Sequence, residues 1–342
     1  MNSPVRSRAL IASALLAFAM FTTAMTPVAA TSVQVGSTQT AAKKKVSAVG
    51  FATYNVCKIE CGTGQWSWPN RRSAITRTVG AANAQVLAVQ EADLGDDHIN
   101  DVARLLKPQG YRLANTGFRN CVGSCGAHIF YKQGSIAPVL ESQRTLAGMV
   151  SQRSLTKGAP WGGVKQDRTI SWALLRTKST GNTFMVISMH LPNEKTGAGE
   201  SVRNAVARAV ARWSRRKAIA HGYRKLPTIV MGDLNSHAGR QPNGAQKQFT
   251  NAGFTDAYNA PRGRNRKYSS INFNQSSARW LGFPPRPFVY GPSGTRLDYI
   301  LSRNTGRARS WELMLRLKSN GAFDNRFRGS DHNLIRATIP IR

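Results

Sequence analysis

Apolar runs of this sequence repeatedly lead to a polar side chain that can bind a ligand. Three examples are residues 86–89 before Glu91, residues 184–187 before His190 and residues 228–231 before Asp233. Runs of this length are typical of strands that are buried on both faces. Because a polar residue at the end of such a strand reaches the rim of the sheet, we expect one site where the strand ends meet. Further candidates at predicted strand ends are Asn55, Asn235, Asp298, Asp331 and His332.

The spacing of the apolar residues predicts many strands and few helices. The predicted strands are residues 51–56, 85–90, 111–114, 128–132, 169–176, 183–189, 228–231, 296–301, 311–317 and 334–339. The predicted helices are residues 70–82, 98–107 and 200–221. The third helix carries a row of basic residues opposite its apolar face: Arg203, Arg208, Arg212, Arg215 and Arg216. We interpret this row as a solvated surface, and a stripe that follows the phosphates of a nucleic acid is the alternative. This pattern favours two sheets packed face to face, with helices outside.

The first 30 residues have the pattern of a secretory signal peptide. Arg6 and Arg8 precede an apolar stretch over residues 9–21, and residues 28–30 form a small-residue cleavage sequence. A membrane anchor is the alternative, but the stretch is shorter than the roughly 20 residues that a spanning helix needs. We expect secretion, with cleavage near Ala30.

A short leader separates the signal peptide from the folded part. Residues 31–45 are rich in Ser, Thr, Gln and Ala and end in three lysines, which is typical of a flexible basic segment. No second segment of this kind follows. We therefore expect one domain over residues 46–342, and a monomer.

The chain has a large excess of positive charge. It contains 48 Lys and Arg residues against 16 Asp and Glu residues, a formal net charge of +32. Such a surface attracts polyanions, so nucleic acid is the expected partner and substrate. Binding to an acidic cell wall is the alternative interpretation.

The four cysteines form two close pairs, Cys57 with Cys61 and Cys121 with Cys125. An even number of cysteines in an exported chain favours disulfides, and four cysteines allow three pairings. A zinc site with four thiolates is the alternative, although zinc-binding pairs more often have two residues between the cysteines. We favour the two local disulfides, one of which would stiffen the chain beside Asn55.

The polar residues at the strand ends suit the hydrolysis of a phosphoester. Carboxylate and amide oxygens are ligands that Mg²⁺ accepts, which makes Glu91 and Asn55 candidates. Asp233 and Asn235 are two residues apart, so an extended backbone would point both side chains to the same side. We expect this pair to share one substrate or one water molecule.

Two imidazoles complete the set of candidate catalytic groups. His332 titrates near neutral pH, and Asp298 is a candidate to orient its ring. His190 is the second imidazole. An activated water, a neutralised phosphate and a stabilised leaving oxygen are what phosphodiester hydrolysis requires, and these residue types supply all three.

As an ordered set, these motifs resemble the endonuclease/exonuclease/phosphatase superfamily, which includes pancreatic-type DNase, repair nucleases, bacterial sphingomyelinases and inositol-polyphosphate phosphatases. The motifs are Tyr54-Asn55-Val56, Gln90-Glu91, Ser188-Met189-His190-Leu191, Gly232-Asp233-Leu234-Asn235, Leu297-Asp298-Tyr299 and Ser330-Asp331-His332. The resemblance covers residues 49–340. It implies an α/β fold of the DNase type, a four-layer sandwich of two packed mixed β-sheets flanked by helices. It also implies dependence on a divalent metal ion, Mg²⁺ or alternatively Mn²⁺ or Ca²⁺.

The resemblance also implies which residues bind the metal and the phosphate. Glu91 is similar to the principal metal ligand, with Asn55 beside it as a second ligand or a phosphate contact. Asp331 resembles a further carboxylate at or near the metal. Arg168 lies where DNase-like members place an arginine that contacts the phosphate.

Catalytic roles follow from the resemblance in the same way. Asp233 resembles the acid that polarises or deprotonates the attacking water, held by Asn235, and Asp298 resembles the partner of His332. His190 matches the histidine of the DNase and sphingomyelinase branches that stabilises the phosphorane or the leaving group. Whether Asp233 or His332 is the general base stays open.

The sequence departs from the DNase pattern at one place. DNase-like members carry an acid just before the strand that matches residues 128–131, where it supports the histidine that His190 matches. This chain has Cys125-Gly126-Ala127 there. We therefore expect His190 to lack its usual carboxylate partner.

Three functions are compatible with this sequence. The leading prediction is a secreted, metal-dependent endonuclease that hydrolyses phosphodiester bonds of nucleic acid. The first alternative is a phospholipid or small phosphate ester as substrate, because the aromatic-rich residues 280–290 suit contact with a membrane as well as stacking on bases or core packing. The second alternative is a non-catalytic, basic nucleic-acid-binding protein.

Overall fold

A computed structural model describes residues 45–93, 97–114, 126–139, 150–154, 169–193, 197–237, 244–272, 276 and 296–342. The compact unit that contains them runs from Lys44 to Arg342. The predicted signal peptide, the leader up to residue 44 and the aromatic residues 280–290 lie outside the described ranges. Among the described helices, none is both long and apolar enough to cross a membrane.

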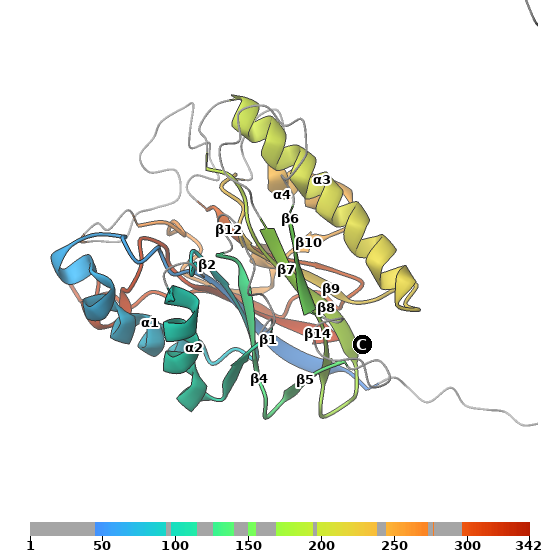
Figure 1. Ribbon diagram of the computed structural model, residues 1–342, viewed down its shortest axis with the longest axis horizontal. Helices are drawn as coiled ribbons and strands as arrows, with labels where there is room; N and C mark the ends of the chain where they lie inside the picture. Colours follow the sequence, from blue (N-terminus) through green and yellow to red (C-terminus); the bar gives the residue numbers. More distant parts are fainter. Residues whose placement is uncertain are drawn as a thin grey trace, which may run out of the picture. The chain divides into compact units, whose positions relative to one another are not determined.

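Two mixed sheets form the centre of this unit (Figure 1). The first has the strand order β11-β13-β14-β1-β2-β4-β3. Its strands are β1 (Ser47–Asn55), β2 (Val86–Gln90), β3 (Tyr111–Leu113), β4 (His128–Lys132), β11 (Arg262–Arg264), β13 (Ser310–Leu313) and β14 (Ile335–Ile341). This sheet is mixed: β1 and β2 are parallel, whereas β14 runs antiparallel to β1.

The second sheet has the order β10-β12-β9-β8-β7-β5, and β6 also pairs with β7. Its strands are β5 (Ile136–Pro138), β6 (Val150–Ser154), β7 (Thr169–Thr177), β8 (Thr183–His190), β9 (Thr228–Asp233), β10 (Thr255–Asp256) and β12 (Asp298–Arg303). Here β8 and β9 are parallel, and β12 runs antiparallel to β9.

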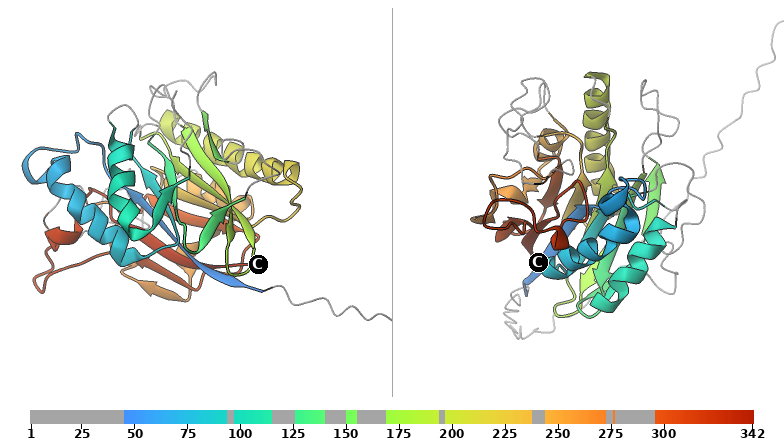
Figure 2. Two further views of the ribbon diagram at one scale, coloured as in Figure 1. Left: turned by 60° about the horizontal axis from the view of Figure 1, so that its bottom comes forward. Right: turned by 90° about the vertical axis from the view of Figure 1, so that its left-hand side faces the viewer.

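Helices cover the outer face of each sheet. They are α1 (Trp68–Ala82), α2 (His98–Leu106), α3 (Gly197–Ala220) and α4 (Ala245–Asn251), with short 3-10 turns η1 (Gly64–Trp66), η2 (Lys107–Gln109), η4 (Ala257–Asn259) and η5 (Asn325–Phe327). Figure 2 (left) shows α1 and α2 on one side of the strands and α3 on the other. The prediction of two packed mixed sheets flanked by helices is confirmed.

Three apolar clusters hold the four layers together. One lies between the sheets and includes Phe51 and Phe184, whose rings meet edge to face at 5.7 Å. A second joins β8 and β9 to α3 and α4, and the third joins β1 and β2 to α1 and α2. The uninterrupted apolar runs of the sequence are therefore strands that are covered on both faces.

Helix α1 begins and ends with local signals that the sequence carries. Pro69 lies in its first turn, where a missing N–H costs nothing. Asn83 ends the helix in the left-handed conformation (φ 47°), and its N–H donates to the carbonyl of Val79. One face of the helix is buried, and this face includes the guanidinium of Arg71.

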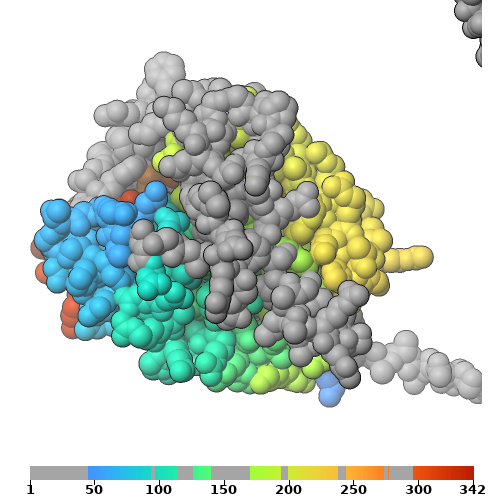
Figure 3. Space-filling view, in the orientation of Figure 1, coloured from blue at the N-terminus to red at the C-terminus, as the bar shows by residue number. Residues whose placement is uncertain are grey.

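Two expectations about individual segments are wrong. The strand predicted over residues 311–317 ends at Leu313, because the chain then turns back on itself and Lys318 pairs with Ala322. Arg203 is not on a solvated face: it is fully buried and donates to Glu200 and to the carbonyl of Pro192. The other arginines of the row are exposed: Arg208, Arg212, Arg215 and Arg216. The surface of α3 is yellow in Figure 3.

Candidate active site

The register of the strands brings the predicted residues together at one edge of both sheets. In the first sheet Asn55 pairs with Gln90, so Glu91 follows directly beside it. In the second sheet Asp233 lies between His190 on β8 and Asp298 on β12. The loop before β14 adds Asp331 and His332.

Hydrogen bonds connect the two sheets at this edge. The amide nitrogen of Asn55 donates to Oε1 of Glu91 (3.0 Å) and to Oδ2 of Asp233 (3.2 Å). Behind it, the side chain of Gln90 donates to the hydroxyl of Ser188 (3.1 Å). The two carboxylates therefore come from different sheets, and Asn55 fixes the distance between them.

Glu91 lies where the chain leaves β2 in a left-handed conformation (φ 61°). Its Oε2 accepts a hydrogen bond from the backbone N–H of Lys58 (3.2 Å), and its Oε1 lies 3.7 Å from Nε2 of His190. Burial alone would raise the pKa of Glu91, but His190 and the bond from Asn55 hold it below its ordinary value. This carboxylate is therefore charged at neutral pH, as a metal ligand must be.

Asp233, Asp298 and His332 form a buried chain of charges. Nδ1 of His332 lies 2.9 Å from Oδ2 of Asp298, and its Nε2 lies 3.7 Å from Oδ2 of Asp233. Burial opposes the charge on His332, but Asp298 and Asp233 raise its pKa well above the ordinary value. Burial and the neighbouring Asp298 raise the pKa of Asp233, against the lowering effect of His332. These three side chains together therefore hold a proton on or next to the ring of His332.

Asn235 adopts a left-handed conformation (φ 47°) just after β9. Its amide nitrogen and Oδ2 of Asp233 lie 3.0 Å and 3.5 Å from Nε2 of His190, so the two side chains converge on one ring, which agrees with the expectation that they point to the same side. The backbone N–H of Asn235 donates to Oδ1 of Asp233 (2.8 Å). Its amide nitrogen also donates to the carbonyl of Leu191 (2.8 Å). Asn235 thus touches both Asp233 and His190, through different atoms.

His190 faces carboxylates although the expected acid is missing before β4. Its Nε2 lies 3.5 Å from Oδ2 of Asp233, in addition to its contact with Glu91. Gly126 lies where the sequence departs from the DNase pattern, and it packs against the backbone of Glu91. A Cβ at Gly126 would lie 3.0 Å from the backbone N and Cα of Glu91. A side chain at Gly126 would therefore press on the backbone that carries Glu91, which would have to shift by a few tenths of an ångström.

Gly232 allows β9 to approach β8 just before Asp233. Its φ is 148°, and a Cβ at this position would lie 1.8 Å from the carbonyl oxygen of Met189. Only glycine fits this approach, which brings the ends of β8 and β9 together.

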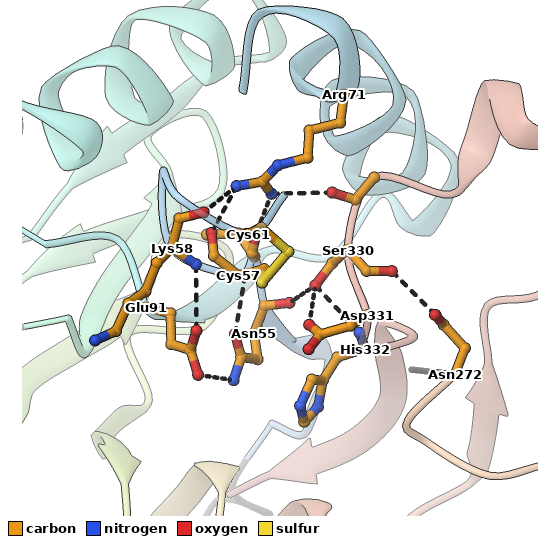
Figure 4. Close-up of a disulfide and its surroundings, with 12 residues drawn as sticks. Asn55, Cys57, Lys58, Cys61, Arg71, Glu91, Asn272, Ser330, Asp331 and His332 are labelled. Atoms are coloured by element: carbon orange, nitrogen blue, oxygen red, sulfur yellow. Dashed lines mark hydrogen bonds between the residues drawn. A yellow bond between two sulfur atoms is a disulfide. The ribbon is translucent and has the colours of Figure 1, made fainter. Parts of the chain in front are cut away.

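A disulfide closes the loop that follows β1 (Figure 4). The predicted pair Cys57–Cys61 is confirmed, with Cα atoms 5.6 Å apart. Within this loop the N–H of Cys57 donates to Oδ1 of Asn55 (3.0 Å), and that of Lys58 to Glu91. The loop therefore orients two side chains of the site through its backbone.

Sequence reasoning missed Arg71, which holds this loop from the side of α1 (Figure 4). Its guanidinium is 2 % exposed and donates to the carbonyls of Cys57 (2.9 Å) and Gly329 (3.0 Å), and also to those of Val56 and Lys58. It thereby joins the loop after β1 to the loop that carries Asp331 and His332. The sequence carries one signal for this role: Arg71 lies at the spacing of the apolar residues that form the buried face of α1.

Ser330 is a second unpredicted connection. Its hydroxyl donates to the carbonyl of Asn55 (2.7 Å), lies 3.2 Å from Oδ1 of Asp331 as an alternative acceptor, and accepts from the N–H of His332 (3.1 Å). A carboxylate oxygen of Asp331 lies within 4.8 Å of the sulfur atoms of Cys57 and Cys61. The hydroxyl of Ser330 fixes the loop before β14 against the end of β1.

The donor groups fit a hard divalent cation. Ligand atoms of Glu91, His190 and Asp233 lie within 4.8 Å of one another, as do those of Asp233, Asp298 and His332. The buried Oδ1 of Asp298 accepts no hydrogen bond from the residues that the structure describes. Clustered carboxylates of this kind suit Mg²⁺, Mn²⁺ or Ca²⁺.

Three predicted residues are not described. Arg168, the predicted phosphate contact, and Cys121 and Cys125, the predicted second disulfide, lie outside the described ranges.

A sequence profile of the endonuclease/exonuclease/phosphatase family matches residues 52–332, and the chain belongs to this family. Enzymes of this family hydrolyse phosphoester bonds and generally depend on a divalent metal ion. No curated protein sequence matches the chain.

Solved structures share the fold at low sequence identity. An endonuclease/exonuclease/phosphatase from Bacteroides vulgatus is 17 % identical and superposes with a TM-score of 0.62, covering 86 % of this chain and 100 % of the other. A mannosyl-6-phosphatase from Bacteroides thetaiotaomicron is 18 % identical, with a TM-score of 0.60 and coverage of 85 % and 99 %. D. rerio TDP2, solved with a single-strand DNA product, is 14 % identical, with a TM-score of 0.55 and coverage of 86 % and 99 %. These likenesses establish the fold and leave the substrate to be argued from the chain itself.

Proposed function

We propose that this protein is a secreted, divalent-metal-dependent endonuclease that hydrolyses phosphodiester bonds of nucleic acid. The observation that carries the proposal is the array of Glu91, Asp233, Asp298, His190 and His332 at one edge of both sheets. An array of this kind can activate water, bind a cation and stabilise a leaving oxygen in one place.

Each described residue has a proposed task. Asp233 accepts the proton of the attacking water, because its raised pKa makes it a stronger base than an ordinary carboxylate. His332, held in its protonated form by Asp298, donates a hydrogen bond to a phosphate oxygen. His190 lies on the other side of Asp233 and faces the leaving oxygen. A cation held by Glu91 would supply neutralisation of the phosphate charge.

The charge of the chain favours nucleic acid over smaller phosphate esters. Four of its 16 acidic residues belong to the site, namely Glu91, Asp233, Asp298 and Asp331, so the rest of the protein is even more basic than the net charge of +32 indicates. Nucleic acid presents closely spaced negative charges, and basic proteins gain affinity when its counterions are released. Secretion follows in the proposal from the signal-peptide pattern of residues 1–30.

The test is incubation of the purified protein with supercoiled plasmid and Mg²⁺. We expect nicking that EDTA abolishes and that falls about 100-fold or more in His332→Ala, because the loss of one hydrogen-bond donor to the charged reacting group typically costs that much. His221→Ala is the matched control, because His221 follows α3 and its ring lies 6.1 Å from that of Trp172, in the middle of β7. Nicking should also fall steeply with added salt.

Other outcomes would select the alternatives. A folded protein that leaves plasmid intact, yet hydrolyses sphingomyelin vesicles or a sugar phosphate in Mg²⁺, would replace the substrate and keep the site. Hydrolysis of none of these, with retained binding to DNA, would favour a non-catalytic binder. Mass spectrometry of the protein from culture medium tests secretion, with an N-terminus near Thr31 as the expected result.

A further inference from the structure

Arg328 is a buried guanidinium with little to hold it in place. It is 8 % exposed, and its charged group lies between two aromatic rings, 4.4 Å from the ring centre of Trp66 and 4.9 Å from that of Phe323. Its Nε and Nη1 are buried and donate to no group that the structure describes. No ion pair of the described residues includes it.

An arginine in this state is incompletely satisfied. Burial lowers the pKa of Arg328 to about 10. Contact with aromatic faces offsets only part of the cost of removing a guanidinium from water. A buried cation usually has an anionic partner, and the described part of this protein provides none.

Arg328 lines a cavity that is suited to an anion. The cavity has a volume of about 480 Å³ and lies between the start of α1 and η5. Arg71 contributes a second positive charge, and no lining residue is acidic. Uncharged hydrogen-bonding groups come from Gln65, Asn70 and Asn325. The start of α1 adds the positive end of a helix dipole.

The cavity is adjacent to the candidate active site. Arg328 precedes Asp331 by three residues, a distance of at most about 11 Å along an extended chain. Arg71 lines the cavity and also donates to the carbonyl of Gly329, next to Arg328. The cavity and the candidate site therefore share one loop, the segment from Arg328 to His332, and Arg71 contacts both.

We propose that Arg328 and Trp66 form a subsite for a phosphate group of the substrate strand that flanks the bond to be cleaved. This inference rests on the proposed function and adds to it a determinant of how the strand is positioned. The phosphate would complete the coordination of Arg328 by charge-assisted hydrogen bonds, while Trp66 keeps the guanidinium in place from one side.

The experiment measures binding of a short oligonucleotide to the full chain in EDTA, so that no cleavage occurs. A series of oligonucleotides carries one uncharged methylphosphonate at successive positions. For the wild-type protein we expect one flanking position where loss of the charge weakens binding about ten- to hundredfold, since a hydrogen-bonded charge contributes about 1.5–3 kcal/mol. In Arg328→Gln this position should become insensitive, while the other positions keep their effect.

A second variant protects the test against misfolding. Gln65 is an exposed lining residue, so Gln65→Glu places a negative charge in the cavity without disturbing the core. Gln65→Glu should weaken binding of the charged oligonucleotide. Its binding should also no longer respond to a methylphosphonate at the position that Arg328→Gln makes insensitive. Gln133→Glu makes the same charge change after β4, at the end of the sheet away from the site, and should keep the wild-type profile.

The outcomes separate the subsite from the proposed function. Equal methylphosphonate profiles in wild type and both cavity variants would overturn the subsite while leaving the nuclease assignment intact. If plasmid is not nicked and oligonucleotides do not bind, the proposed function fails. A titration with inorganic phosphate then decides whether the cavity binds phosphate. Quenching of tryptophan fluorescence that disappears in Arg328→Gln and Trp66→Phe supports a phosphate site, and an equal response in all three proteins rejects it.

Discussion

The backbone N–H of Lys58 donates to Oε2 of Glu91 at 3.2 Å, from within the loop that the Cys57–Cys61 disulfide closes. A covalent bond thus restricts the group that orients the predicted metal ligand. Orientation of a ligand by a neighbouring hydrogen bond typically changes metal affinity by 10–100-fold.

Replacement of both Cys57 and Cys61 by serine tests this connection. We expect a loss of about 2 kcal/mol in the free energy of unfolding, because the closed loop is short, and about a tenfold rise in the Mg²⁺ concentration for half-maximal activity. Activity against Mg²⁺ concentration, with unfolding in urea, measures both. Treatment with a reductant should reproduce the shift in wild type and leave the double variant unchanged. An unaltered Mg²⁺ requirement would show that the disulfide acts on stability alone.

Arg71 should be important for stability because it satisfies four backbone carbonyls in a buried place. Arg71→Met removes the donor to the carbonyls of Val56, Cys57 and Gly329, whereas the carbonyl of Lys58 keeps its bond from the N–H of Cys61, and we expect a loss of about 3 kcal/mol or more in the free energy of unfolding. Arg71→Lys keeps the charge and should lose less. Arg72→Met is the control, because Arg72 is the exposed neighbour on the same helix. Equal stabilities of Arg71→Met and Arg72→Met would contradict this account.

Asp298→Asn should reduce turnover while leaving substrate binding nearly intact. The amide cannot hold the proton on His332 as the carboxylate does at 2.9 Å, so we expect kcat to fall about 10²- to 10⁴-fold with little change in KM. Steady-state kinetics on a phosphodiester substrate separates the two constants. Asp97→Asn, a change of the same kind at an exposed residue, should have wild-type kinetics. A change confined to KM would assign Asp298 to binding.

His128 should make the protein less stable in acid. Burial lowers its pKa to about 4, against the attraction of the Ala92 carbonyl at 2.8 Å. The unfolded chain takes up a proton near pH 6.5 and the folded protein only near pH 4, so stability is complete above 6.5 and falls as the pH drops between these values. The loss reaches about 3 kcal/mol at pH 4.

His128→Asn isolates this effect, because asparagine does not titrate. Urea unfolding at pH 7 and at pH 4.5 should show a smaller loss of stability in the variant than in wild type. The same loss in both proteins would mean that other groups, such as the carboxylates of the site, account for the acid sensitivity.

The sequence was sufficient to predict the sheets and the place of the site. Strands such as β2, β8 and β9 are covered on both faces, so each leaves an uninterrupted apolar run whose end is visible in the sequence. The structure brings the polar residues after these runs together, although their catalytic roles stay predictions. Short edge strands such as β10 and β11 were not predicted, because two or three residues carry no periodic signal.

Other parts of the site depend on tertiary contacts that no local pattern encodes. Glu91 and Asn235 adopt left-handed conformations just after β2 and β9, and no periodic signal in the sequence marks them. The contacts of Arg71 and Ser330 join segments more than 250 residues apart in the sequence. Contacts of this kind follow from the fold as a whole, since the carbonyls concerned become buried only when both loops are packed.

The position of β14 determines when the protein can first become active. This strand lies between β13 and β1 in the first sheet, so β1, made early during synthesis, gains its second neighbour only when residues 335–341 have been added. His332 enters the site with the same segment. A growing chain already contains Asn55 and Glu91, but lacks the imidazole held by Asp298. For the proposed nuclease, this order of assembly completes the site only when the last residues have been made, which gives the predicted signal peptide time to act first.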